Sequence, residues 1–215
     1  IGTDKLPYVI KNMREKIIEL GGEIYFDTKV VDFIFHSDLA DSKQIIGVKT
    51  KNTTTNEIKE LYSNKVVLST GHSATDIYLL LAKHSPSSLE AKTFAAGVRV
   101  EHPREYIDSI QYHNNDSKGL GSAEYRVTTQ VMERGVYSFC MCPGGFVVPS
   151  ASGPDEIVVN GMSSSGRNSK WSNAALVVEI RPEDIPQKFV DLAKQSGCEA
   201  LSGLFFRASI EQSAK

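Results

Sequence analysis

The chain has 215 residues and a mass of 23.6 kDa, and 24 Lys and Arg against 26 Asp and Glu give a formal net charge of −2. Hydrophobic residues make up 40% and charged residues 23% of the sequence, which is typical of a globular protein and not of a disordered one. The near-neutral charge argues against a nucleic-acid binder, and no apolar run approaches the roughly 18 residues of a membrane-spanning helix. We therefore expect neither nucleic acid nor a membrane as a partner.

The ends of the chain and its cysteines bear on its context. It begins Ile1-Gly2-Thr3 without a methionine or a signal-peptide pattern, and it ends inside a helical pattern, so we expect an internal piece of a longer protein. Three cysteines in a chain of this size without a signal peptide favour a reducing compartment over a disulfide scaffold. A cytoplasmic location is the corresponding expectation.

Residues 1–92 combine two helices with short strands. Apolar residues recur at helical spacing from Leu6 to Leu20, Thr3 or Asp4 can cap the start, and Gly21-Gly22 is expected to end this first helix. The further elements expected here are a strand over 23–30 that continues toward 36, a hairpin of 45–51 with 57–62, a buried parallel strand over 65–71 and a helix over 74–84.

From residue 93 onward, short strands with Gly and Pro between them are typical of an antiparallel sheet. The strands are expected at 94–101, 123–131, 136–142, 146–149, 157–160 and 175–180, and the helices at 104–110, 186–195 and from 199 to the end. We therefore predict a mixed α+β fold with two domains, 1–92 and 93–215, of which the second is a largely antiparallel sheet with helices.

The first chemical signal is Ser69-Thr70-Gly71-His72-Ser73, between the expected strand 65–71 and the next helix. A glycine at the end of a strand lets the backbone approach a ligand, and the following helix N-terminus favours an anion. The alternative is a turn glycine followed by Ser73 as a helix N-cap. No G-x-G-x-x-G or other phosphate-binding fingerprint accompanies the segment, so the chain has no complete dinucleotide cradle of its own.

The second signal is Tyr137-Ser-Phe-Cys-Met-Cys-Pro-Gly-Gly145. Residues i and i+2 of a strand share a face, so Cys140 and Cys142 are expected to present both sulfurs together. They could form a dithiol beside a cofactor, supply half of a metal site, or pack as small apolar residues. Because no second Cys or His pair has ligand spacing, we predict no metal.

Two further strings carry polar side chains. In Gly97-Val-Arg-Val-Glu-His-Pro103, Arg99 and Glu101 share a strand face and could form an ion pair. Arg99 could instead bind an anion and His102 could move protons, although a surface salt bridge and a plain strand end are the simpler interpretation. The segment 160–167, together with Asn173, is rich in Gly, Ser and Asn and could line a ligand or form an ordinary loop.

Four strings in this order resemble the uncharacterised FAD-dependent dehydrogenase family of bacteria, also described as NAD(FAD)-utilising dehydrogenases. They are Thr70-Gly-His-Ser-Ala-Thr-Asp76, Gly97-Val-Arg-Val-Glu-His-Pro103, Ser138-Phe-Cys-Met-Cys-Pro-Gly-Gly145 and Asn160-Gly-Met-Ser163. The resemblance covers nearly the whole chain, and C-x-C-P-G-G is its most specific part. The family commonly has Arg before Asp76, where this chain has Thr75, so a role for that Arg is not carried over.

The resemblance implies that residues 1–92 are the remnant of a two-dinucleotide-binding-type FAD domain and residues 93–215 a substrate-side domain. FAD would bind to the full-length protein, with the backbone of Val30 at the adenine and Gly71 near the ADP moiety. Thr70, His72 and Ser73 are weaker neighbours of that site. The candidate catalytic residues facing the flavin are Arg99, His102, Cys140 and Cys142.

The resulting hypothesis is a fragment of a FAD-dependent oxidoreductase that acts on a small-molecule substrate or takes electrons from a donor such as NAD(P)H. The fragment alone is expected to be inactive and free of flavin, because the glycine fingerprint is not in it. The alternative is a non-enzymatic ligand-binding or thiol-sensing module in which the C-x-C string is structural.

Overall fold

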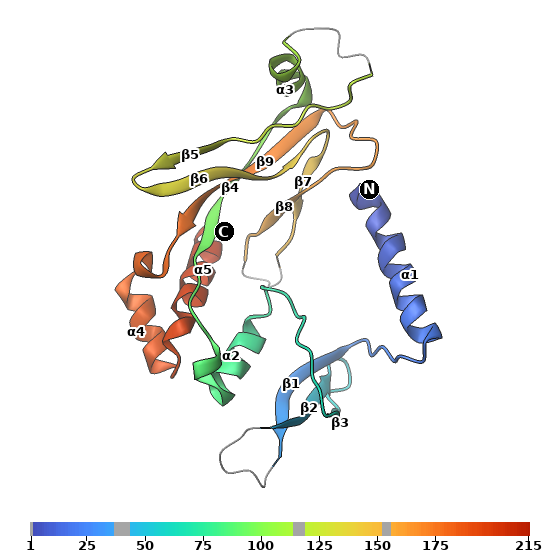
Figure 1. The fold of residues 1–215 in the computed structure, drawn as a ribbon, viewed down its shortest axis with the longest axis vertical. Helices are drawn as coiled ribbons and strands as arrows, with labels where there is room; N and C mark the ends of the chain where they lie inside the picture. The colour runs from blue at the N-terminus through green and yellow to red at the C-terminus, as the bar shows by residue number, and fades with distance from the viewer. Residues whose placement is uncertain (1, 37–43, 114–118, 152–155) are drawn as a thin grey trace. The chain divides into compact units, whose positions relative to one another are not determined.

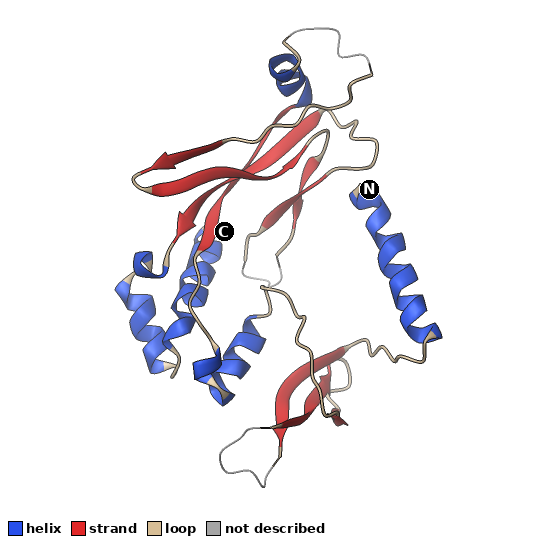
Figure 2. Ribbon diagram, in the orientation of Figure 1, coloured by secondary structure: helices blue, strands red, loops and turns tan. Residues whose placement is uncertain are grey.

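The computed structural model describes residues 2–36, 44–113, 119–151 and 156–215. Helices and three antiparallel sheets make up these residues, which confirms the predicted mixed α+β class (Figures 1 and 2). The chain divides into two compact units, one of residues 14–88 and one of residues 1–13 with 89–215. Within the described ranges no helix combines the length and the apolar character needed to cross a membrane.

The unit of residues 14–88 holds a three-stranded sheet of order β1-β2-β3, with β1 over Thr28–Phe35, β2 over Ile45–Asn52 and β3 over Ile58–Tyr62. The pairing of β2 with β3 confirms the predicted hairpin. Its turn begins at Asn52, whose Oδ1 accepts hydrogen bonds from the N–H groups of Thr54 and Thr55. The helix α2, Thr75–His84, completes the unit as expected.

Two predicted strand segments of this unit are wrong. Residues 65–71 form no strand, and Val67 is 86% exposed. A parallel strand needs neighbours that supply its ladder of hydrogen bonds, and the described antiparallel sheet does not extend to this segment. Residues 23–27 are also outside any strand, because Asp27 has a left-handed backbone (φ +51°) that interrupts the extended run just before β1.

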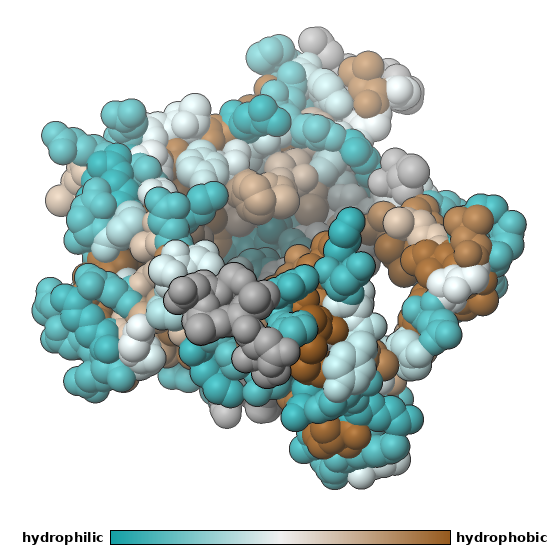
Figure 3. All heavy atoms as spheres, turned by 60° about the horizontal axis from the view of Figure 1, so that its bottom comes forward, coloured by the Kyte–Doolittle hydropathy of each residue, from teal (hydrophilic) through white to brown (hydrophobic). Residues whose placement is uncertain are grey.

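The helix α1, Leu6–Glu19, carries its apolar side chains on the surface. The exposed apolar residues of this helix include Leu6, Val9, Ile10, Met13 and Ile17. Figure 3 shows hydrophobic surface over this helix. The helix ends as predicted, because Gly21 adopts φ +83° and the N–H of Gly22 reaches back to the carbonyl of Ile17 in a glycine-terminated cap.

The other unit is built on a four-stranded antiparallel sheet of order β4-β9-β6-β5. Two further strands, β7 and β8, pair as a separate ribbon. The elements are β4 (Phe94–Pro103), α3 (Arg104–Gln111), β5 (Thr128–Val131), β6 (Arg134–Cys142), β7 (Phe146–Pro149), β8 (Val159–Met162), β9 (Trp171–Ile180), α4 (Gln187–Gln195) and α5 (Ser202–Ser213), with short 3₁₀ turns at Thr3–Lys5, Pro182–Asp184 and Glu199–Leu201. A further 3₁₀ turn, Pro86–Ser88, belongs to the unit of residues 14–88.

The strand β9 is the centre of this sheet. It begins at Trp171, earlier than the predicted 175, because residues 171–174 continue the pairing with the end of β4. Ser172, Asn173 and Ala174 have no exposed surface, so the middle of the unit contains buried polar groups that must be hydrogen-bonded. The strand β5 is shorter than the predicted 123–131.

In the unit of residues 14–88, called the first unit below, Asp32 joins the sheet to α2. Its Oδ1 lies 2.5 Å from His84 Nε2 and its Oδ2 lies 3.2 Å from Lys83 Nζ. Burial by itself raises the pKa of Asp32, but the hydrogen bonds from His84 and Lys83 outweigh burial and lower the pKa from 3.8 to about 2. The ionised carboxylate is therefore part of what holds α2 against β1.

We predict that Asp32→Asn lowers the free energy of unfolding by roughly 1 kcal/mol at neutral pH, because it removes the charge from these hydrogen bonds. Folding lowers the pKa of Asp32, so the ionised carboxylate stabilises the fold fully above pH 3.8, and this stabilisation is lost as the pH falls toward about 2. Urea unfolding followed by circular dichroism should show a difference between variant and wild type that shrinks across this range. Asp27→Asn in the same unit is the control, and an equal loss in both variants would contradict the prediction.

Candidate functional site

Arg99 contacts three strands, β9, β6 and β8, of the second unit, which consists of residues 1–13 and 89–215. Its Nη1 donates to Asn173 Oδ1 on β9 at 2.8 Å and to the carbonyl of Cys140 on β6 at 3.1 Å. Its Nη2 lies 3.5 Å from Asn160 Oδ1 on β8. In the sheet Arg99 is paired with Ala175, whose small side chain lets the arginine cross β9 and reach the backbone of β6.

All the acceptors around Arg99 are neutral. The predicted ion pair with Glu101 is not formed, because Glu101 Oε2 instead accepts the N–H of Val147 at 3.4 Å. No carboxylate in the described part of the chain forms an ion pair with Arg99, and its Nε is buried without a hydrogen-bond partner. A half-buried guanidinium whose charge is not balanced by the protein favours an anionic ligand.

The two cysteines of the C-x-C string do not alternate as a regular strand requires. The register of β6 against β9 shifts between Phe139 and Cys142, which places one extra residue in β6. Cys140 lies in this bulge with a left-handed backbone (φ +44°). The regular strand geometry from which we expected the sulfurs of Cys140 and Cys142 to share a face is therefore not present, because a bulge reorients the side chains on either side of it. Both thiols are free; Cys140 is exposed and Cys142 is half-buried.

Cys142 belongs to the group of side chains around Arg99. We call this group, Arg99, Cys142, Asn160 and Asn173, the Arg99 cluster. A Cβ added at Gly161 of β8 would collide with Asn173 Oδ1, Arg99 Nη1 and Cys142 Sγ, so these three groups converge on that glycine. Burial raises the pKa of the Cys142 thiol, although the charge of Arg99 and the hydroxyl of Ser163 act in the opposite direction. A raised pKa means that Cys142 is a neutral thiol near neutral pH and a weak nucleophile.

His102 forms a second pair on the opposite face of the sheet, because it is three residues along β4 from Arg99. Its Nε2 lies 2.9 Å from the hydroxyl of Tyr125, and the two rings are 5.5 Å apart. The Nδ1 atom of His102 is buried without a hydrogen-bond partner. Burial raises the pKa of the Tyr125 phenol, with the charge of Arg99 acting the other way, which places Tyr125 within electrostatic reach of Arg99. The contact with Tyr125 therefore fixes the orientation of the His102 ring.

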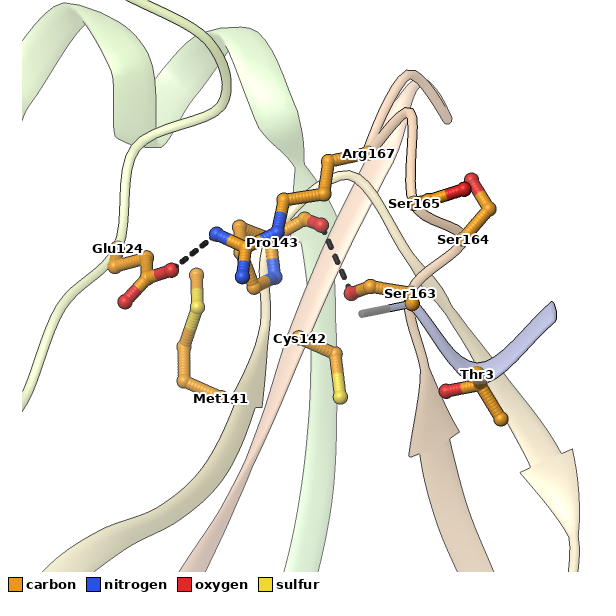
Figure 4. Close-up of a pocket in the computed structure, with 10 residues that line it drawn as sticks. Thr3, Glu124, Met141, Cys142, Pro143, Ser163, Ser164, Ser165 and Arg167 are labelled. Atoms are coloured by element: carbon orange, nitrogen blue, oxygen red, sulfur yellow. Dashed lines mark hydrogen bonds and ion pairs between the residues drawn. The ribbon is translucent and has the colours of Figure 1, made fainter. Parts of the chain in front are cut away.

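A pocket of about 540 Å³ adjoins the cluster at Cys142. Its lining comes from β6, from the loop after β8, from the segment before β5 and from the start of the chain, as Figure 4 shows. In this pocket Ser163 Oγ donates to the carbonyl of Pro143, and Arg167 forms an ion pair with Glu124. These polar groups of the pocket lining therefore already have protein partners. The charge of Arg167 is thereby balanced, unlike that of Arg99.

The residues expected near the FAD lie in the other unit. Val30 is paired with Thr50 at the start of β1, and the neighbouring Lys29 forms a 2.8 Å ion pair with Asp76 at the start of α2. This ion pair links the strand end that carries Val30 to the helix that follows residues 70–73.

The segment before α2 is exposed. Thr70, Gly71, His72 and Ser73 all lie on the surface. Gly71 has φ +77° and nothing within 4 Å of an added Cβ, so its backbone is open to approach. Ala74 occupies the N-cap of α2 and no side chain caps the helix there, so the alternative of Ser73 as the N-cap is wrong.

Sequence reasoning missed Tyr125. It stands in a segment with no motif, and only the three-dimensional fold places it beside His102, 23 positions away along the chain. Asn160 and Asn173 were singled out only as members of a polar string, and their convergence on Arg99 could not be read from spacing. Within the described ranges, no three His, Cys, Asp or Glu side chains gather as a metal site would require.

Two comparisons with known proteins place the chain. Residues 93–215 match the model of a family described as FAD-dependent protein, C-terminal domain-like. The whole chain is also similar to an uncharacterized protein of Clostridium beijerinckii, with 41% identity over 217 residues. The chain spans 37% of the length of that relative.

We predict that the three thiols differ in reactivity. At about pH 7 an alkylating reagent should label the exposed Cys140 first, Cys142 at least about tenfold more slowly because burial raises its pKa, and Cys198 only on unfolding. Mass-spectrometric mapping of the labelled sites checks the order. Cys140→Ser is the matched variant and should remove the fast phase, whereas a fast phase at Cys142 would contradict the assignment.

Proposed function

The chain belongs to the FAD-dependent protein, C-terminal domain-like family, and on that basis we propose that it is part of a FAD-dependent oxidoreductase whose substrate-side wall is built around Arg99. The observation that carries the proposal is the half-buried guanidinium of Arg99, which is fixed by neutral acceptors and keeps an unbalanced positive charge. Such a group stabilises negative charge that is bound or develops next to it.

Features of the first unit are compatible with holding FAD. The N-terminus of α2 lacks a side-chain cap, the backbone at Gly71 is open, and Lys29 neutralises Asp76 in the first helical turn. An uncapped helix start next to an accessible glycine suits an anionic group. We therefore assign the FAD contacts to Val30, Thr70, Gly71, His72 and Ser73.

When bound, FAD supplies the hydride and electron chemistry of such an enzyme. The residues of this chain supply position, charge and protons. Arg99 is held by two hydrogen bonds from Nη1, so its charge stays at a fixed place and needs no reorganisation during reaction. His102, which Tyr125 orients through Nε2, is the residue that we assign to proton transfer.

The cysteines have a lining role in this proposal. The raised pKa of Cys142 leaves little thiolate, so we assign it to the wall between the Arg99 cluster and the pocket. Cys140 fixes Arg99 through its backbone carbonyl and not through its sulfur. The string thus serves the site through its bulge and its carbonyl.

The remaining assignments belong to the same proposal. The division into 1–92 and 93–215 separates the FAD side from the substrate side. The reaction partner is a small molecule or an electron donor such as NAD(P)H, in the cytoplasm. Reduced, unpaired thiols are compatible with that compartment.

One observation favours the alternative of a thiol-sensing module. Cys140 is exposed and stands in a left-handed bulge two residues from a second thiol, which is an accessible position for an oxidant. Both interpretations expect a fast Cys140, so the discriminating result is the effect of its modification: a sensor requires that modification of Cys140 alters the protein.

We predict that the purified full-length protein shows the visible absorption of oxidised flavin after addition of FAD and that residues 1–215 alone do not. Arg99→Met should leave these bands in place but slow reduction of the flavin by about 100-fold, because a fixed charge is removed from the reacting region. Stopped-flow absorbance measures the rate. The exposed Arg126→Met is the control, and a folded full-length protein that never acquires the bands would refute the oxidoreductase proposal.

Tyr125→Phe should keep the ring next to His102 but remove its hydrogen bond. We expect flavin absorption to be unchanged, the rate of flavin reduction to fall about tenfold and its pH profile to shift, because the histidine loses the group that orients it. Tyr106→Phe, at an exposed tyrosine, is the matched control. An unshifted pH profile of the rate in Tyr125→Phe would contradict the proposed role of His102 in proton transfer.

A further inference from the structure

The guanidinium of Arg99 makes its shorter hydrogen bonds to the protein from one nitrogen, Nη1. Both hydrogen bonds of normal length to the protein leave from Nη1, to Asn173 Oδ1 and to the carbonyl of Cys140. Nε has no hydrogen-bond partner, Nη2 has a 3.5 Å contact with Asn160, and the Arg99 side chain also interacts with the Cys142 thiol. The Nε and Nη2 N–H groups of an arginine point the same way and form the edge that takes a carboxylate with two parallel hydrogen bonds.

We propose that this edge of Arg99 binds the carboxylate of a small substrate whose body is apolar or aromatic. The inference rests on the proposed function and names its substrate class. A third donor supports it, because the fully buried Asn173 also has an unpartnered Nδ2. An unpaired buried donor is costly, so unpartnered donors on these two contacting side chains favour a ligand rich in acceptors.

The surroundings favour a single negative charge. Glu101 lies two residues along β4 from Arg99 and therefore on the same face of the sheet. It is held by the N–H of Val147 and keeps its own charge close to the site. A carboxylate matches the single charge of Arg99, and the repulsion from Glu101 is smaller for a singly charged carboxylate than for a doubly charged phosphate.

The same sheet face offers an apolar surface for the rest of the ligand. Arg99 is in one row with Ala175 and Phe139, and the adjacent row holds Gly97, Val177 and Tyr137. Directly opposed residues share a face, so both aromatic side chains stand on the side of Arg99. Phe139 is 56% exposed and Tyr137 36% exposed, with Ala175 and Val177 of β9 between them and the arginine strand. This combination suits a flat or apolar body attached to the carboxylate.

Titration calorimetry on the full-length protein, without and with added FAD, tests the inference. The probes are benzoate, the neutral benzamide, the small carboxylate acetate, and inorganic phosphate. We expect saturable binding of benzoate, at least about tenfold weaker binding of benzamide and of acetate, and no competition from phosphate. Equal binding of benzoate and benzamide, or phosphate competing as well as benzoate, would overturn the proposal.

Variants locate the site. Arg99→Met should abolish benzoate binding, and Arg99→Lys, which keeps the charge but not the fork, should weaken it about tenfold while preserving the fold by circular dichroism. Phe139→Ala should reduce the preference for benzoate over acetate at least about threefold without loss of acetate binding. Arg126→Met should change nothing. Unchanged benzoate affinity in Arg99→Lys or in Phe139→Ala would refute the assignment.

The outcome is separable from that of the oxidoreductase proposal. Flavin absorption without benzoate binding would overturn the carboxylate site alone. Benzoate binding that depends on Arg99 in a protein that never takes up flavin would support the site and refute the oxidoreductase.

Discussion

The hydrogen bond from Arg99 Nη1 to Asn173 is the constraint on which the unit of residues 1–13 and 89–215 depends. Asn173 lies without exposed surface in the central strand β9, and its side chain oxygen needs a donor there. Arg99 supplies that donor from β4 and reaches the Cys140 carbonyl on β6 with the same nitrogen. One side chain therefore fixes three strands and holds a positive charge at a defined place.

The local irregularities of this unit follow from that arrangement. A regular β6 would not turn the carbonyl of Cys140 toward the arginine, and the bulge with its left-handed residue changes the direction of the backbone there. Gly161 is required because any side chain would collide with the converging groups. Strain in β6 and a glycine in β8 thus accompany an arginine whose charge the protein leaves unbalanced, a combination typical of sites prepared for a ligand.

Much of the secondary structure could be predicted from the sequence. The end of α1 at Gly21-Gly22 and the hairpin β2–β3 depend on local backbone chemistry, and both are found in the structure. The strand over 65–71 was wrong because a run of apolar residues indicates only a tendency to extend, whereas a strand also needs partners in space. The types of residue at the site were visible in the motifs, but their partners were not.

By itself the sequence determined the mixed α+β class and the Arg, His and Cys strings that resemble FAD-dependent proteins, since composition, periodicity and motifs are local properties of the chain. Only the tertiary structure decided what these residues contact. It gave Arg99 neutral partners in place of Glu101, joined His102 to Tyr125 and raised the pKa of Cys142. The physical reason is that burial, strand register and unpaired charge arise from segments distant along the chain, and no spacing in the sequence encodes which of them will meet.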